Sequence, residues 1–72
     1  MNKEKILVLI GQRIKDLREE KNISQQSLGD LCNFEKSNMS RIEAGRNNLT
    51  IGTLLTISEI LGVKLKEIVD VE

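Results

Sequence analysis

Apolar residues recur every three or four positions along the whole of this chain. Ile6, Ile10, Ile14 and Leu17 follow one another at intervals of four, four and three residues, which places them on one stripe of a helix. A sustained alternation of apolar and polar residues, which would indicate a strand, occurs nowhere in the sequence. The spacing therefore predicts an all-α fold.

Four residues that tolerate a left-handed backbone interrupt this helical pattern: Asn22, Asn33, Gly45 and Gly62. Ser24 and Thr50 stand where a hydroxyl group would cap the start of the following helix. Gly11 lies in the middle of the first helix, where a glycine is costly unless another backbone comes close. We expect five helices, over residues 3–21, 25–31, 35–44, 51–61 and 65–69.

Length and composition exclude several classes of protein. The 72 residues support a single domain over residues 1–72, and its small core leaves little room for a substrate pocket. One cysteine and no histidine exclude an internal disulfide, a structural zinc site and histidine-dependent catalysis. The longest apolar run, residues 6–10, is too short to span a membrane. We expect a cytoplasmic binding module rather than an enzyme, with no metal, cofactor, small-molecule ligand or membrane contact.

One of the expected helices carries hydrogen-bond donors along an entire side. Between residues 35 and 44, only Met39 and Ile42 are spaced to face the interior. The opposite side carries ammonium, guanidinium and hydroxyl groups, from Lys36, Ser37, Ser40 and Arg41. In the major groove, guanine offers two acceptors and adenine offers a donor beside an acceptor. This side of the helix therefore suits the base edges of double-stranded DNA.

The segment around this helix resembles the Cro/C1-type (XRE-like) helix-turn-helix DNA-binding family. The resemblance rests on ISQQSLG at residues 23–29, NF at residues 33–34 and MSRIEAG at residues 39–45. It extends over about residues 10–69 without an insertion. It implies a compact five-helix fold of the lambda-repressor type, in which the second and third helices form the helix-turn-helix. It also implies a sequence-specific transcriptional regulator.

The resemblance also implies roles for individual residues. Lys36, Ser37 and Arg41 would face base edges, with Ser40 close by. Arg18 and Glu43 match a structural ion pair of the family. The residues that would hold the DNA backbone are Gln25, Asn38, Arg46, Asn47, Asn48 and Thr50. Three positions depart from the family pattern, namely Gly29, Glu35 and Leu49, where the family favours alanine, a serine or threonine cap, and proline.

The net charge of zero does not argue against DNA binding, because the charge is unevenly distributed. Residues 1–46 carry a net charge of +2, whereas residues 47–72 carry a net charge of −2. Attraction to phosphate depends on the local surface and not on the total charge. We expect modest, salt-dependent affinity for unrelated sequences.

The apolar residues of the C-terminal half point to self-association. In residues 51–61 the inward stripe is expected to be Ile51, Leu54, Leu55, Ser58 and Leu61. Ile57 and Ile60 fall outside it, and we expect them to form a dimer interface with Val63 and Val69. A two-fold dimer would place two recognition helices about 34 Å apart on a palindromic operator. Restriction–modification controllers and phage repressors are possible settings. An antitoxin-like module that mainly binds a toxin remains the alternative.

Overall fold

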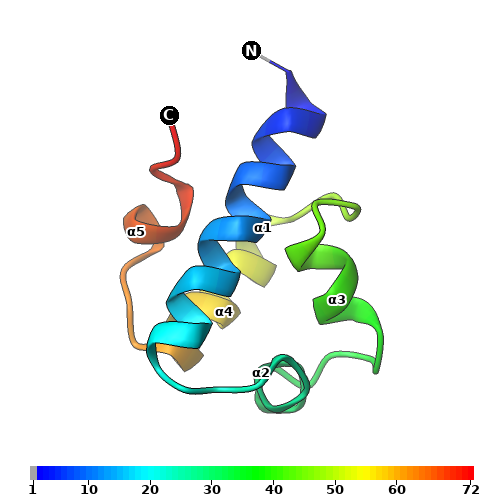
Figure 1. Ribbon diagram of the computed structural model, residues 1–72, viewed down its shortest axis with the longest axis vertical. Coiled ribbons are helices and arrows are strands. Elements are labelled where there is room, and N and C mark those ends of the chain that lie inside the picture. Colours follow the sequence, from blue (N-terminus) through cyan, green and yellow to red (C-terminus); the bar gives the residue numbers. More distant parts are fainter. Residues whose placement is uncertain (1) are drawn as a thin grey trace.

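Residues 2–72 are described by the computed structural model, and they form five α-helices in the expected order (Figure 1). The helices are α1 (Lys3–Glu20), α2 (Gln25–Leu31), α3 (Asn38–Glu43), α4 (Ile51–Leu61) and α5 (Leu65–Val69). This part of the chain contains no strand. The prediction of an all-α fold with five helices is therefore confirmed.

The expected N-caps and left-handed residues are found at the boundaries between helices. The Ser24 hydroxyl accepts a hydrogen bond from the backbone N–H of Ser27 at 3.0 Å, and the Thr50 hydroxyl accepts one from Thr53 at 3.1 Å. Asn22 and Asn33 adopt left-handed backbones, with φ angles of 58° and 61°. These local signals divide the chain before any tertiary contact forms.

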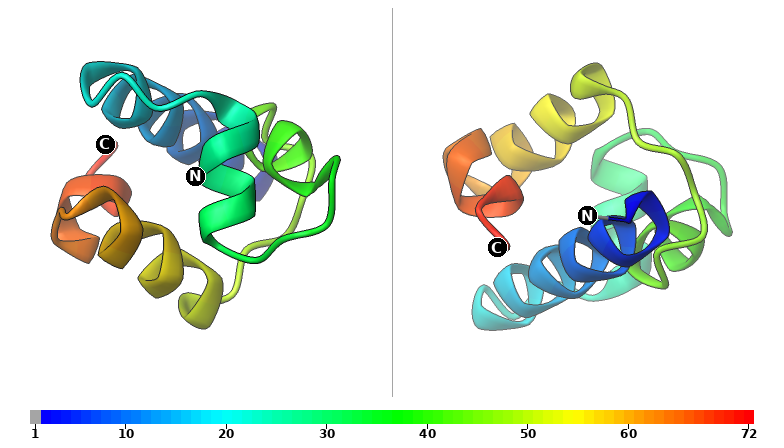
Figure 2. Two further views of the ribbon diagram at one scale, coloured as in Figure 1. Left: turned by 90° about the horizontal axis from the view of Figure 1, so that it is seen from below. Right: turned by 90° about the horizontal axis from the view of Figure 1, so that it is seen from above.

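Helix α1 runs through the structure and contacts α2, α3 and α5 (Figure 1). Figure 2 shows α1 and α4 on opposite sides, with α5 at one end and α2 and α3 at the other. The core between these helices is made of buried apolar side chains: Ile10, Ile14, Leu17, Leu28, Cys32, Met39, Ile42, Leu54, Ile57, Leu61 and Ile68. Because α2 and α3 pack against this core through Leu28, Met39 and Ile42, the angle between them is set by apolar contacts.

The predicted inward face of α4 is confirmed for Leu54, Ser58 and Leu61 but wrong for Ile51 and Leu55. Ile57 is 0% exposed and belongs to the core, whereas Ile51 is 62% exposed and Leu55 is 44% exposed. The buried residues of α4 are Leu54, Ile57, Ser58 and Leu61. This set and the predicted one both have helical spacing, and the contacts of α4 with α2 and α5 select the set that contains Ile57. Ile57 therefore cannot lie in a dimer interface while this fold is intact.

The third helix begins three residues later than predicted, at Asn38. The residues before it form a turn in which the Asn38 N–H donates to the Glu35 carbonyl at 2.9 Å. Glu35 is a poor N-cap, and the Ser37 hydroxyl accepts from Arg41 Nη1 at 2.7 Å instead of capping the backbone. Lys36 and Ser37 therefore precede α3 and do not lie on it.

Two helical glycines lie at crossings between helices, and they differ in the space around them. A Cβ atom on Gly11 would lie 2.5 Å from the carbonyl oxygen of Ile42, so α1 touches the backbone of α3 there. This confirms the close approach expected at Gly11. A Cβ atom on Gly29 would meet the Cβ of Met39 at 3.5 Å, which is an ordinary contact.

This difference predicts opposite effects for the same substitution. Gly29→Ala should raise the free energy of unfolding by about 0.5–1 kcal/mol, because alanine favours a helix interior and the methyl group has room. Gly11→Ala should lower it by about 1–3 kcal/mol, because the methyl group would displace α3. Urea denaturation followed by circular dichroism measures both. A Gly11→Ala variant as stable as the wild type would contradict the close approach.

Candidate nucleic-acid interface

The four side chains expected to read bases all face solvent. Lys36, Ser37, Ser40 and Arg41 are exposed, along the turn before α3 and the outer side of α3. Arg41 Nη1 donates to the Ser37 hydroxyl at 2.7 Å, so these two side chains are already held side by side. None of the four is buried against the body of the protein. The arrangement can present ammonium, guanidinium and hydroxyl donors to a groove of the duplex, and contact with bases stays a prediction.

The two flanks of α3 differ in charge. A groove of about 460 Å³ separates α2 from the turn before α3, and the carboxylates of Asp30 and Glu35 line it beside Lys36. The other flank, beside Ser40, adjoins Lys15 and Gln12 of α1. Because carboxylates repel phosphate, the second flank is the more favourable one for the DNA backbone.

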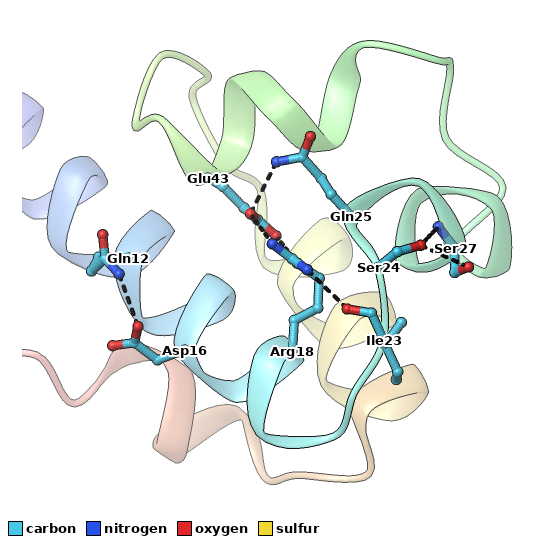
Figure 3. A network of polar contacts seen from close by, with 8 residues as sticks. All are labelled: Gln12, Asp16, Arg18, Ile23, Ser24, Gln25, Ser27 and Glu43. Atoms are coloured by element: carbon cyan, nitrogen blue, oxygen red, sulfur yellow. Dashed lines mark hydrogen bonds and ion pairs between the residues drawn. The ribbon is translucent and has the colours of Figure 1, made fainter.

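An ion pair joins α1 to α3 beneath the exposed donors (Figure 3). Arg18 Nε donates to Glu43 Oε2 at 2.7 Å, and Arg18 Nη2 donates to Glu43 Oε1 at 3.0 Å. Arg18 Nη1 also donates to the carbonyl of Ile23 at 2.8 Å, just before α2. Both residues are buried, and the hydrogen bond that Arg18 donates to Glu43 raises the pKa of Arg18. The expected ion pair is confirmed, and it fixes α1 and α3 to the segment that leads into α2.

Gln25 extends this network from α2. The sequence did not predict its bond to Glu43. Its Nε2 donates to Glu43 Oε1 at 3.0 Å (Figure 3). An amide nitrogen carries two hydrogens, so one donor of Gln25 remains for a phosphate. The signal available in the sequence was its place at the first position of α2, directly after the Ser24 cap.

The residues expected to hold the DNA backbone fall into two groups. Arg46, Asn48 and Thr50 are exposed. Asn38 and Asn47 are partly buried, and Asn47 Nδ2 donates to Asn38 Oδ1 at 2.6 Å, which ties the start of α3 to the loop after it. The structure therefore gives this pair a role in shaping the loop, and their contact with DNA stays a prediction.

Cys32 is buried, and burial raises the pKa of its thiol, which disfavours the reactive thiolate. Among residues 2–72, no group of three histidine, cysteine, aspartate or glutamate side chains could hold a metal ion. No helix of the described residues has the length and apolar character needed to cross a membrane.

A helix-turn-helix family model, HTH_3, matches residues 14–68. The chain belongs to this helix-turn-helix family of XRE-like, DNA-binding transcriptional regulators. The match covers α2, α3 and α4 in full, together with the C-terminal part of α1 and most of α5. The fold predicted from the resemblance is therefore confirmed.

Individual relatives agree with this assignment. The chain is 35% identical over 66 residues to control protein C.BamHI of Bacillus amyloliquefaciens, covering 90% of this chain and 82% of the relative. It is 35% identical over 63 residues to an immunity repressor protein of Bacillus phage phi105, covering 88% of this chain and 44% of the repressor. The crystal structure of the restriction–modification controller protein C.AhdI from Aeromonas hydrophila matches with a TM-score of 0.82 and 31% identity, covering 86% of this chain and 94% of that one.

The ion pair predicts a strong dependence of stability on both of its members. Arg18→Met should destabilise the fold by about 3–5 kcal/mol, because it leaves the buried Glu43 carboxylate without its charged partner. The double variant Arg18→Met/Glu43→Leu should recover most of that loss, since no buried charge remains. Urea denaturation of the two variants tests this, and a double variant no more stable than Arg18→Met would contradict the explanation.

Proposed function

We propose that this chain is a homodimeric, sequence-specific regulator that binds a palindromic operator in double-stranded DNA. It acts in the cytoplasm as a single domain over residues 1–72, without catalysis and without a cofactor. The observation that carries the proposal is the outward row of donors formed by Lys36, Ser37, Ser40 and Arg41. The Arg18–Glu43 pair holds α3 in place behind this row.

Each part of the surface has a distinct task in this proposal. Lys36, Ser37, Ser40 and Arg41 read base edges, because their donors project furthest from the core. Gln25, Asn38, Arg46, Asn47, Asn48 and Thr50 contact the backbone and set the register. The hydroxyl of Thr50 already caps α4, so its backbone amide would make the contact. Backbone contacts position the protein, whereas base contacts distinguish one sequence from another.

The proposed setting is the control of a restriction–modification system. Two relatives support it: C.BamHI and C.AhdI, one named a control protein and the other a restriction–modification controller, and both are matched over most of their length. The phage repressor is matched over less than half of its length. The two controllers therefore resemble this chain over a larger share of their own length than the repressor does.

The proposed dimer forms through α4 and its neighbours. The proposed interface keeps Ile60, Val63 and Val69. It no longer includes Ile57, which is buried. Ile51 and Leu55 are also exposed on α4, but at about 100° per residue they lie about 140–180° around the helix axis from Ile60 and so outside this interface. One short recognition helix reads few base pairs, so a second copy is needed for a useful degree of discrimination.

Substitution of Arg41 tests the reading of bases. Selection of bound sites from a random duplex pool first gives the operator. Arg41→Ala should then weaken operator binding by about 1–3 kcal/mol and relax the preference at one base pair. Gln25→Ala serves as the comparison, because loss of a phosphate contact should weaken binding to all sequences about equally. Unchanged operator preference in Arg41→Ala would refute its role.

Substitution on α4 tests the dimer. The variant Ile60→Glu should sediment as a monomer and lose affinity for a duplex with two half-sites, because it places two carboxylates in the interface. Val8→Glu, which changes an exposed apolar residue of α1, should remain dimeric. If the wild type sediments as a monomer while its apolar surface is intact, the dimer is wrong and a module that binds another protein becomes the better interpretation.

A further inference from the structure

A small hollow opens where α1, α2 and α3 meet, on the flank of α3 that carries Ser40. Its volume is about 250 Å³, and it is lined by polar groups from all three helices: Gln12, Lys15, Gln25, Ser40 and Glu43, with Ala44 beside them. Figure 3 shows Gln12, Gln25 and Glu43 around this junction. Gln12 and Lys15 had no part in the predicted site.

The charges around the hollow leave it positive. Both oxygens of Glu43 accept hydrogen bonds, from Arg18 and from Gln25, so the guanidinium of Arg18 compensates the carboxylate. Lys15 is exposed and has no ion-pair partner among residues 2–72. Gln12 donates one amide hydrogen to Asp16 Oδ1 at 2.8 Å and keeps the other. Asp16 accepts this bond and does not itself line the hollow.

We propose that this hollow binds one phosphate group of the DNA backbone, beside the groove that α3 enters. The inference deepens the proposed function and rests on it. The Lys15 ammonium supplies the charge, and the Ser40 hydroxyl with the remaining amide hydrogens of Gln12 and Gln25 supplies neutral donors. Ser40 belongs both to this hollow and to the row that faces the bases, so a strand whose bases meet α3 passes directly over it.

The opposite flank of α3 supports this placement. There, Asp30 and Glu35 line the groove between α2 and the turn, and their carboxylates would repel a phosphate. The hollow at Lys15 therefore determines which side of α3 the strand follows. In this way α1 contributes directly to DNA binding, beyond supporting α3.

The test is the salt dependence of DNA binding by Lys15→Gln. Each phosphate contact contributes about 0.9 to the slope of log K against log salt concentration. The slope should therefore decrease in magnitude by about 1.8 for a dimer on two half-sites. Affinity for operator and for unrelated duplex should fall by the same factor. Lys66→Gln, on α5, removes the same charge away from the hollow and should leave the slope unchanged.

A duplex in which single phosphates are replaced by neutral methylphosphonates locates the contact. At one position per half-site, the replacement should weaken the wild type much more than Lys15→Gln, in which only the neutral donors of the hollow remain. That result separates a backbone phosphate from a free phosphate ion, which would instead compete with DNA at constant ionic strength. The proposal is wrong if Lys15→Gln matches Lys66→Gln in slope, or if every replacement weakens wild type and variant equally. If the wild type itself prefers no duplex sequence, the proposed function fails instead.

Discussion

The buried ion pair between Arg18 and Glu43 is the interaction on which the functional surface depends. It joins the end of α1 to the end of α3, and a third bond from Arg18 reaches the backbone before α2. A buried charge without its partner is costly, so neither residue can leave the other. The apolar contacts of α2 and α3 are not directional. The ion pair adds a preferred orientation, because a bidentate guanidinium–carboxylate contact has one favoured geometry. The same carboxylate holds Gln25, so α1, α2 and α3 meet at one group.

The parts of the fold that were predictable from sequence are those that local chemistry determines. Asn22 and Asn33 adopt the left-handed conformation that asparagine tolerates, and Ser24 and Thr50 cap the helices after them. Gly11 sits where α1 meets a backbone, as its unfavourable place in a helix suggested. The exposed donors of α3 followed from the same reasoning, since only Met39 and Ile42 were available to face inward.

The errors arose where two local choices were equally good. In α4, the predicted and the buried stripe share Leu54, Ser58 and Leu61, and contacts with α2 and α5 bury Ile57 in place of Ile51 and Leu55. At the start of α3, the side chain of Ser37 had two competing partners, the backbone and Arg41, and it bonds to Arg41. The bond from Gln25 to Glu43 and the proposed contacts of Gln12 and Lys15 could not be foreseen for a related reason. They depend on how three helices meet in space, and the spacing of residues along the sequence does not contain that information.

The charge arrangement also bears on how a protein of zero net charge can distinguish sequences. Binding to unrelated DNA comes mainly from phosphate contacts and the release of counterions. In the proposed complex, the carboxylates of Asp30 and Glu35 disfavour phosphate on one flank of α3 and so limit the number of such contacts. Weak binding to unrelated DNA leaves less nonspecific competition for the operator. The proposed base contacts are those of Lys36, Ser37, Ser40 and Arg41. A neutral chain can therefore bind its operator with modest affinity and still discriminate well, since discrimination is the ratio of specific to nonspecific binding.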